Sequence, residues 1–131
     1  MATSKIPNPI VKRSTVTLSS SDIEQQRLII QESNSSIIYK VQSGICFLTL
    51  HNILLGDNFK TMGSDATVLN NIPPSSKTSC VAWAFLPRES DTTLLINIPF
   101  TPTSDGTLKS NQVTAAKMSH AINLLIVYPV V

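Results

Sequence analysis

The residues of this sequence that could carry chemistry are few, and the densest group lies in a charged loop. Arg88, Glu89 and Asp91 follow Pro87 and interrupt an apolar pattern, which is typical of an exposed loop between neighbouring strands. Two carboxylates that act on a glycosidic bond as acid and base lie about 5 to 9 Å apart around a cleft. A pair two residues apart in a turn is more typical of a solvated loop, so we predict no catalytic site.

The two cysteines and two histidines do not form a metal-binding or catalytic pattern. Cys46 and Cys80 each lie inside an alternating apolar run, which favours two small buried residues. A disulfide between them requires that their strands be neighbours. His51 and His120 are far apart, and neither has a cysteine at the spacing of a zinc site. A histidine without a positioned partner is no general base, so we expect neither a metal nor a cofactor.

The sequence motifs of common enzyme classes are absent as well. We find no GxSxG nucleophile elbow, no phosphate-binding P-loop, no dinucleotide fingerprint and no HExxH zinc motif. A longer, carboxylate-lined groove would be needed for a polysaccharide hydrolase. We therefore expect that the protein is not an enzyme.

The composition excludes further function classes. Charged residues make up 14% of the chain, against roughly 25% in average soluble domains. No basic run is longer than Lys12-Arg13, so the electrostatic pattern of a nucleic-acid-binding surface is missing. The apolar segments are shorter than the roughly 20 residues of a membrane helix. Pro7 and Pro9 interrupt the region where a signal peptide would be apolar. We predict no nucleic acid, no membrane insertion and no signal peptide.

A low charge and a high apolar content together favour self-association. Hydrophobic residues make up 42% of the chain, which suggests that other subunits cover part of the apolar surface. Within the run Cys80–Phe85, the larger side chains of Val81, Trp83 and Phe85 share one face. We expect Trp83 to lie in the core or in a subunit interface rather than on a ligand platform.

The elements that must position these residues are short β-strands. Alternating runs of strand length are bounded by Gly, Pro, Ser or Asn. The pairs Ser43-Gly44 and Asp105-Gly106 predict two hairpins. The expected strands are Arg27–Gln31, Ser36–Gln42, Ile45–His51, Ser79–Leu86, Thr92–Ile98 and a terminal run that includes Ile122–Val127.

These strands predict one all-β domain over residues 1–131, an antiparallel β-sandwich or barrel of jelly-roll type. Residues 1–13 are expected to form an extended N-terminal arm. Ser21 stands three residues before Glu24, the spacing of a capping box, so a single helical turn is expected there. Ala115–Met118 fits either a helical turn or an excursion between strands.

Four stretches follow one another in a characteristic order, namely Ile37–Phe47, Leu69–Pro73, Asp105–Leu108 and Tyr128-Pro129. This order resembles the C-terminal head domains of phage tail-fibre and receptor-binding proteins. The resemblance covers about two-thirds of the chain and implies a homotrimeric β-sandwich or barrel that caps a fibre and contacts the host. The sequence has four glycines and one Trp, fewer than such heads usually have, which argues against a sugar platform of several stacked aromatics.

The resemblance also implies where the protein acts and with what. It implies a protein of the virion surface, assembled in the host cytoplasm, whose partners are copies of itself, other virion proteins and a host cell-surface glycan or protein. For a hydroxyl-rich ligand, Arg88, Glu89 and Asp91 supply the densest cluster of charged donors and acceptors. Tyr39 is the next candidate. The alternative is a capsid-decorating or fibre-capping subunit without a ligand of its own.

Overall fold

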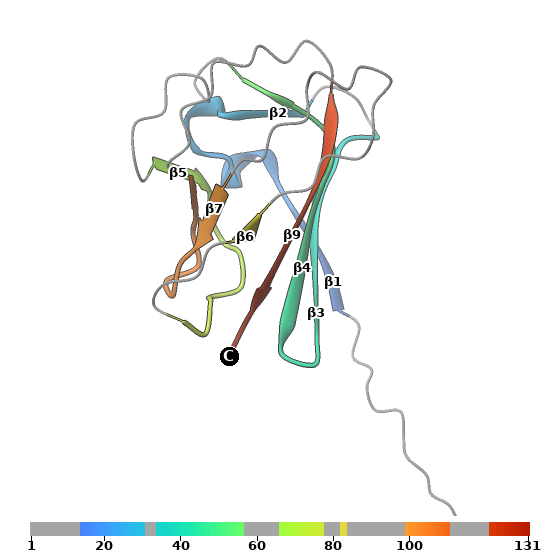
Figure 1. The fold of residues 1–131 in the computed structure, drawn as a ribbon. Helices are drawn as coiled ribbons and strands as arrows, with labels where there is room; N and C mark the ends of the chain where they lie inside the picture. The colour runs from blue at the N-terminus through green and yellow to red at the C-terminus, as the bar shows by residue number, and fades with distance from the viewer. Residues whose placement is uncertain (1–13, 31–33, 57–65, 78–81, 84–98, 111–120) are drawn as a thin grey trace, which may run out of the picture.

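The computed structural model describes residues 14–30, 34–56, 66–77, 82–83, 99–110 and 121–131. These residues form two antiparallel β-sheets that face each other across one hydrophobic core and do not close into a barrel (Figure 1). The expected all-β class is confirmed, and the arrangement resembles a sandwich.

The first sheet has the strand order β1-β3-β4-β2. The strand β9 also pairs with β4, on the side of β4 opposite to β3. The strands are β1 (Ser14–Leu18), β2 (Leu28–Ile30), β3 (Ser36–Gln42), β4 (Ile45–Leu55) and β9 (Ile122–Pro129). The second sheet has the order β5-β8-β7-β6. Its strands are β5 (Ala66–Leu69), β6 (Ala82–Trp83), β7 (Pro99–Pro102) and β8 (Leu108–Ser110).

Both predicted hairpins are present. Ser43 and Gly44 have φ values of 53° and 77°, which is the conformation of a type I′ turn, so β3 and β4 pair in a tight two-residue hairpin. The second hairpin joins β7 to β8 through a longer loop, in which Gly106 has a φ of 86°. The Gly106 carbonyl accepts the Ile72 N–H at 3.0 Å, and this bond ties the loop to the turn that follows β5.

A β-bulge lets β4 run on to Leu55, beyond the end predicted from the sequence. The ladder to β9 shifts between Leu50 and Ile53, and both of these side chains are fully buried. Between them, Asn52 has a φ of 57°, and its N–H donates to Oδ1 of Asn123 at 2.7 Å. The extra residue keeps the buried side chains of both halves of β4 on the core side.

The core is built from the facing sides of both sheets. The first sheet contributes alternate residues of β3, β4 and β9, as the period of a strand requires. Among the described side chains, the two largest fully buried ones of the core are Tyr128 from the first sheet and Phe100 from the second. The other buried hydrophobic residues are Leu18, Leu28, Ile37, Cys46, Leu48, Leu50, Ile53, Leu55, Val68, Leu69, Ile72, Leu108, Leu124 and Ile126.

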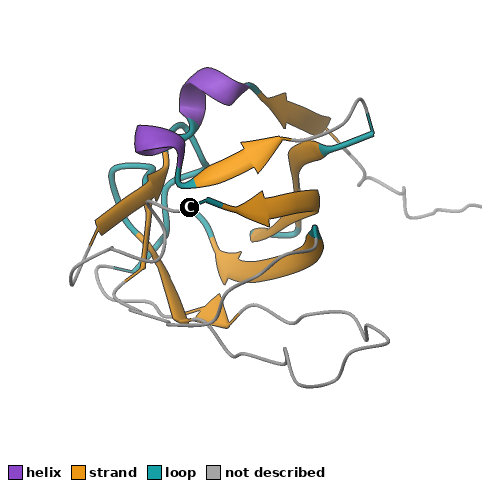
Figure 2. Ribbon diagram, turned by 90° about the horizontal axis from the view of Figure 1, so that it is seen from above, coloured by secondary structure: helices purple, strands orange, loops and turns teal. Residues whose placement is uncertain are grey.

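The helical turn expected before β2 is present, but its capping pair differs from the prediction. Two short 3-10 turns, η1 (Ser20–Asp22) and η2 (Glu24–Gln26), precede β2 (Figure 2). The reciprocal contacts involve Ser19 and Asp22, not Ser21 and Glu24: the Asp22 N–H donates to the Ser19 carbonyl at 3.0 Å, and the Ser19 N–H donates to Asp22 Oδ2 at 2.8 Å. Both pairs have the same spacing, so the motif alone does not choose between them.

Several predictions fall partly or wholly outside the described residues. Of the expected strand Ser79–Leu86, the structure describes Ala82–Trp83 as β6. Nothing is described of the Trp83 side chain, so its predicted burial stays a prediction. Thr92–Ile98, Ala115–Met118 and the expected arm of residues 1–13 lie outside the described residues.

Candidate functional site

A shallow hollow lies on the face of the first sheet that turns away from the second sheet, which we call the outer face. It has a volume of about 260 Å³ and lies over β1, β3 and β4. Two aromatic residues, one lysine and two threonines are among the residues that line it. The residues that line it are Thr15, Ile38, Tyr39, Lys40, Phe47 and Thr49.

Strand register places these side chains. Thr15, Lys40 and Phe47 stand opposite one another on three neighbouring strands, and Ile38 and Thr49 form the next row. The residues that alternate with Phe47 along β4 are buried in the core, so Phe47 belongs to the outer face. The Lys40 ammonium lies 5.8 Å from the centroid of the Phe47 ring, within the range of a cation–π interaction.

The hollow has the chemistry of a binding surface rather than of a catalytic site. Threonine hydroxyls both donate and accept hydrogen bonds, and the ammonium donates three. The described residues that line the hollow include no carboxylate, histidine or cysteine, so these residues offer no nucleophile with an adjacent base. Among the described residues, no group of three or more His, Cys, Asp or Glu side chains could hold a metal ion.

Of the predicted site residues, the structure places Tyr39 at this hollow. Tyr39 alternates with Ile38 and Lys40, so it shares the side of β3 that faces the core, and its half-buried side chain packs against the core. Its side chain therefore lies on the opposite side of β3 from the side chain of Lys40. Arg88, Glu89 and Asp91 lie outside the described residues.

Sequence reasoning missed the residues that dominate the hollow, although a signal was present. The two-residue turn at Ser43-Gly44 fixes the register of the hairpin, and this register pairs Lys40 with Phe47. Both residues then share the face opposite to the apolar alternation of β4. The hairpin turn does not predict that Thr15 lines the hollow, because two 3-10 turns and β2 separate β1 from β3 in the sequence.

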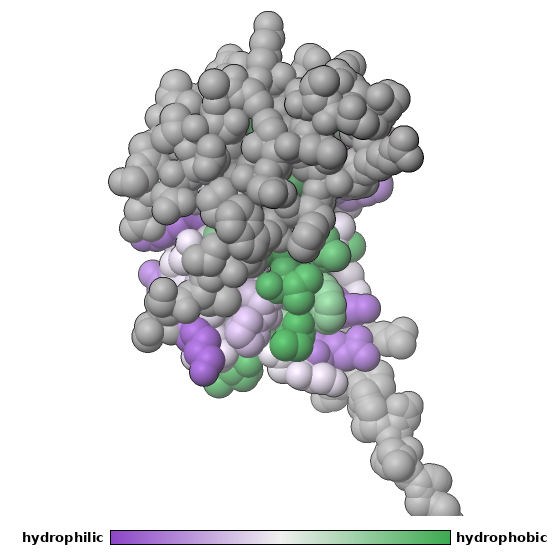
Figure 3. All heavy atoms as spheres, in the orientation of Figure 1, coloured by the Kyte–Doolittle hydropathy of each residue, from purple (hydrophilic) through white to green (hydrophobic). Residues whose placement is uncertain are grey.

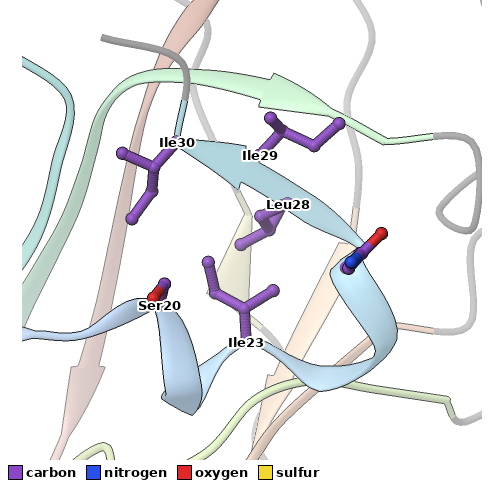
Figure 4. Close-up of a pocket in the computed structure, with 6 residues that line it drawn as sticks. Ser20, Ile23, Leu28, Ile29 and Ile30 are labelled. Carbon is purple, nitrogen blue, oxygen red and sulfur yellow. The ribbon is translucent and has the colours of Figure 1, made fainter.

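A second hollow lies between the 3-10 turns and β2 (Figure 4). It has a volume of about 440 Å³, and Ile23 and Leu28 extend toward each other inside it. Its lining is dominated by aliphatic side chains, with Ser20 and Gln26 at its margin. We read it as a gap in the packing of the turns over the sheet, since it lacks the converging polar groups that orient a ligand.

The described cysteine, Cys46, is surrounded by the hydrophobic core. Cys46 is a free, fully buried thiol in β4, as the alternating pattern favoured, and Cys80 lies outside the described residues. Burial raises the pKa of the Cys46 thiol, against a smaller opposing effect of a hydrogen bond with Tyr128. A protonated, inaccessible thiol is a poor nucleophile, so Cys46 is a core residue.

The described carboxylates with shifted pKa values also hold structure in place. Asp22 accepts the Asn71 side-chain amide at 2.6 Å. This bond, followed by the bond from the Ser19 N–H, lowers the pKa of Asp22 below its ordinary value of 3.8. In the β7–β8 loop, the hydroxyl of Thr103 donates to Asp105, and this contact is the largest cause of the lowered Asp105 pKa. Each carboxylate fixes a turn.

Comparison with known proteins gives no relative for this chain. No protein-family model, no curated protein and no solved structure matches it. In the described part of the chain, no helix has both the length and the apolar character needed to cross a bilayer.

Proposed function

We propose that this protein is a binding module of a virion surface, of the fibre-head type, and that the hollow over β1, β3 and β4 contacts a host cell-surface saccharide. The observation that carries the proposal is the row Thr15, Lys40 and Phe47, in which a hydroxyl, an ammonium and an aromatic ring stand side by side on neighbouring strands.

The chemistry of a sugar fits this row. The apolar face of a pyranose ring can stack on the Phe47 ring, while the sugar hydroxyls exchange hydrogen bonds with Thr15 and Thr49. Lys40 adds a charge-assisted donor, which favours a saccharide with acidic or phosphorylated groups. Both hairpins on which the resemblance rests are formed in the structure, and this supports the same function.

Self-association is part of the proposal, and the resemblance implies three copies. On the outer face of β9, Leu125 and Val127 are 38% and 39% exposed. They continue the rows of Thr49 and Phe47. Figure 3 shows hydrophobic surface beside the lower ends of β9 and β4. An apolar strip of this kind favours contact with another protein chain.

The same strip supports a second candidate function. A capsid-decorating or fibre-capping subunit needs apolar surface for its neighbours in the virion and no ligand site. Leu125 and Val127 serve that role equally well, and a shallow hollow is compatible with a surface that binds nothing. The two functions differ in one measurable property, the binding of a host glycan.

Binding of the full chain to a glycan array and to isolated bacterial wall polysaccharides tests the proposal. We expect wild type to bind at least one acidic polysaccharide and Phe47→Ala to lose at least tenfold in affinity. Ile29→Ala, in β2 and away from both the hollow and the strip on β9, is the matched control because Ile29 is 38% exposed, and it should bind like wild type. If wild type binds no saccharide and no host cell, the capping function is favoured.

A further variant in this experiment tests the charged loop of Arg88, Glu89 and Asp91. Replacement of Arg88, Glu89 and Asp91 together by Ser should leave folding intact and, if the hollow is the site, should also leave attachment intact. If this triple variant loses attachment while Phe47→Ala retains it, the site belongs to the loop and not to the hollow.

A further inference from the structure

The first sheet ends at β1, and the outer edge of this strand is open. β1 pairs with β3 through all five of its residues, and no described strand lies on its other side. In Figure 1, β1 forms the margin of the sheet. Open edges present backbone donors and acceptors that can pair with another chain.

We propose that two copies of this chain pair antiparallel through their β1 edges, around a two-fold axis at Val16. The pairing joins the two five-stranded sheets into one continuous sheet. This inference rests on β1 alone, so it does not depend on whether the protein binds a saccharide.

The hydrogen bonds already formed determine which backbone groups remain for a partner. Backbone donors and acceptors alternate in direction along an antiparallel strand. The Val130 N–H donates to the Gly44 carbonyl at 2.9 Å, which identifies the side of β4 that faces β9. We follow this alternation from β4 to β3 and then to β1 through their registers. The backbone N–H and C=O groups of Val16 then point toward β3. The N–H and C=O groups of Thr15 and Thr17 point toward the open edge.

The outward N–H and C=O groups of Thr15 and Thr17 can pair with the same groups of a second copy. In an antiparallel pair centred on Val16, Thr15 of one copy stands opposite Thr17 of the partner subunit, and each such pair exchanges two hydrogen bonds. Thr15 and Thr17 are exposed on the outer face, where cross-strand threonine pairs are favourable. Val16, 36% exposed, meets Val16 of the partner subunit on the core side.

The sequence of β1 lacks three features that often prevent an edge strand from pairing: a charged residue, a proline and a bulge. The strand reads Ser-Thr-Val-Thr-Leu, with no charge and no proline, and its register with β3 has no bulge. Isolated edges in native proteins usually carry at least one of these features. The absence of charge also means that a second copy meets no like charge along the strand. A second copy therefore satisfies every group that the edge exposes.

The pairing completes the hollow on the outer face. Thr15 lines the hollow at its β1 margin, and in the pair Thr17 of the partner subunit adds a hydroxyl beside it. The strip on β9 lies at the far side of the sheet and stays available. A second contact there, such as the one that a trimer needs, is compatible with the edge pair and gives an assembly with an even number of copies.

Charge substitutions at Thr15 and Thr17 test the register. Light scattering coupled to size exclusion measures the mass at chain concentrations up to about 100 µM, since a short edge interface is expected to be weak. We expect an even-numbered wild-type assembly. Thr15→Lys with Thr17→Lys places like charges opposite each other and should halve the mass. Thr15→Lys with Thr17→Glu places opposite charges together and should keep or strengthen the pair.

Two further variants separate edge pairing from other contacts. Thr17→Pro removes an N–H that points outward and should also halve the mass, with folding checked by circular dichroism. Val127→Ser alters the β9 strip and should leave the edge pair in place. A wild-type monomer or trimer would overturn the proposal, as would equal dissociation of the Lys/Lys and Lys/Glu variants. The glycan array decides the binding function separately.

Discussion

At the scale of single residues, Tyr128 connects β9 to the turn that follows β5. Its side chain is 1% exposed, and its hydroxyl donates to the Pro73 carbonyl at 2.8 Å. The contact is part-buried, and an acceptor that loses a hydrogen-bond donor in such a place keeps part of the cost of its desolvation. One hydroxyl therefore contributes to holding the two sheets together.

We predict that Tyr128→Phe lowers the free energy of unfolding by about 1 to 3 kcal/mol, because the Pro73 carbonyl loses this donor. Urea denaturation followed by circular dichroism measures the change. Tyr39→Phe is the matched control, because the Tyr39 side chain is only half-buried, and its effect should stay below about 0.5 kcal/mol. Equal effects of the two variants would contradict the assigned role of Tyr128.

Asp22 makes the stability depend on pH. Its pKa is lowered in the folded state by the Asn71 amide and then by the Ser19 N–H. A carboxyl whose pKa is depressed on folding stabilises the protein above its unfolded pKa, near 3.8. This contribution is lost as the pH falls through the lower, folded pKa.

We therefore expect Asp22→Asn to flatten the decline of stability in the pH range below about 4.5. Urea midpoints measured from pH 7 down to pH 2.5 test this. Asp105 titrates in the same direction, so some decline should remain in the variant. An unchanged slope would mean that the Asn71 contact does not persist in solution.

At the scale of elements, the β3–β4 hairpin depends on a turn with two positive φ values. Gly44 adopts a φ of 77°, and an added Cβ would meet only the Val130 carbonyl, at 4.0 Å. A substitution at Gly44 is therefore strained by the backbone and not by a steric clash. Ser43, with a φ of 53°, is a less suitable residue than asparagine for its position.

Two substitutions in this turn should change stability in opposite directions. Gly44→Ala is expected to cost about 1 to 2 kcal/mol, the penalty of a left-handed residue that carries a Cβ. Ser43→Asn creates the preferred Asn-Gly turn and should raise the melting temperature. Differential scanning calorimetry of both variants measures the effects. A neutral Gly44→Ala would indicate that the turn can change its type.

The elements show how far the sequence determines the fold. The strands β3 and β4 and both hairpins follow from alternation and from the Ser-Gly and Asp-Gly pairs, which are local signals. The extension of β4 could not be predicted, because the bulge at Asn52 depends on a hydrogen bond that the Asn52 N–H donates to Asn123, in a strand distant in the sequence.

The candidate site was less predictable than the fold. Tyr39 lines the hollow, and its role as a site residue stays a prediction. The contact between Lys40 and Phe47 depends on the hairpin register, and Thr15 reaches the hollow only because β1 returns to pair with β3. No local pattern encodes that return. A site that is built across three strands follows from the strand order, which local periodicity does not specify.

At the scale of the whole molecule, one core joins two sheets, and Phe100 is the largest fully buried residue that the second sheet contributes among the side chains the structure describes. We predict that Phe100→Ala lowers the free energy of unfolding by about 3 to 5 kcal/mol, because its cavity cannot close fully. This is a large share of the roughly 5 to 15 kcal/mol that holds a domain together.

Leu125→Ala is the matched control for this prediction, since Leu125 is 38% exposed on the outer face. In the monomeric state it should cost less than about 1 kcal/mol. Chemical denaturation of both variants at low protein concentration makes the comparison. Similar losses would mean that the outer face of the first sheet is covered within one chain.

The register of the first sheet also determines how the domain would respond to a pulling force. Ser14 stands opposite Val41, and Pro129 stands opposite Ile45, so β1 begins and β9 ends at the same end of the sheet, the end of the Ser43-Gly44 turn (Figure 1). A load applied between these two points acts across the strands and opens their hydrogen bonds one after another, instead of loading all of them in shear. If the chain were held at Ser14 and the load were applied at the hollow over β1, β3 and β4, only these three strands would carry the force.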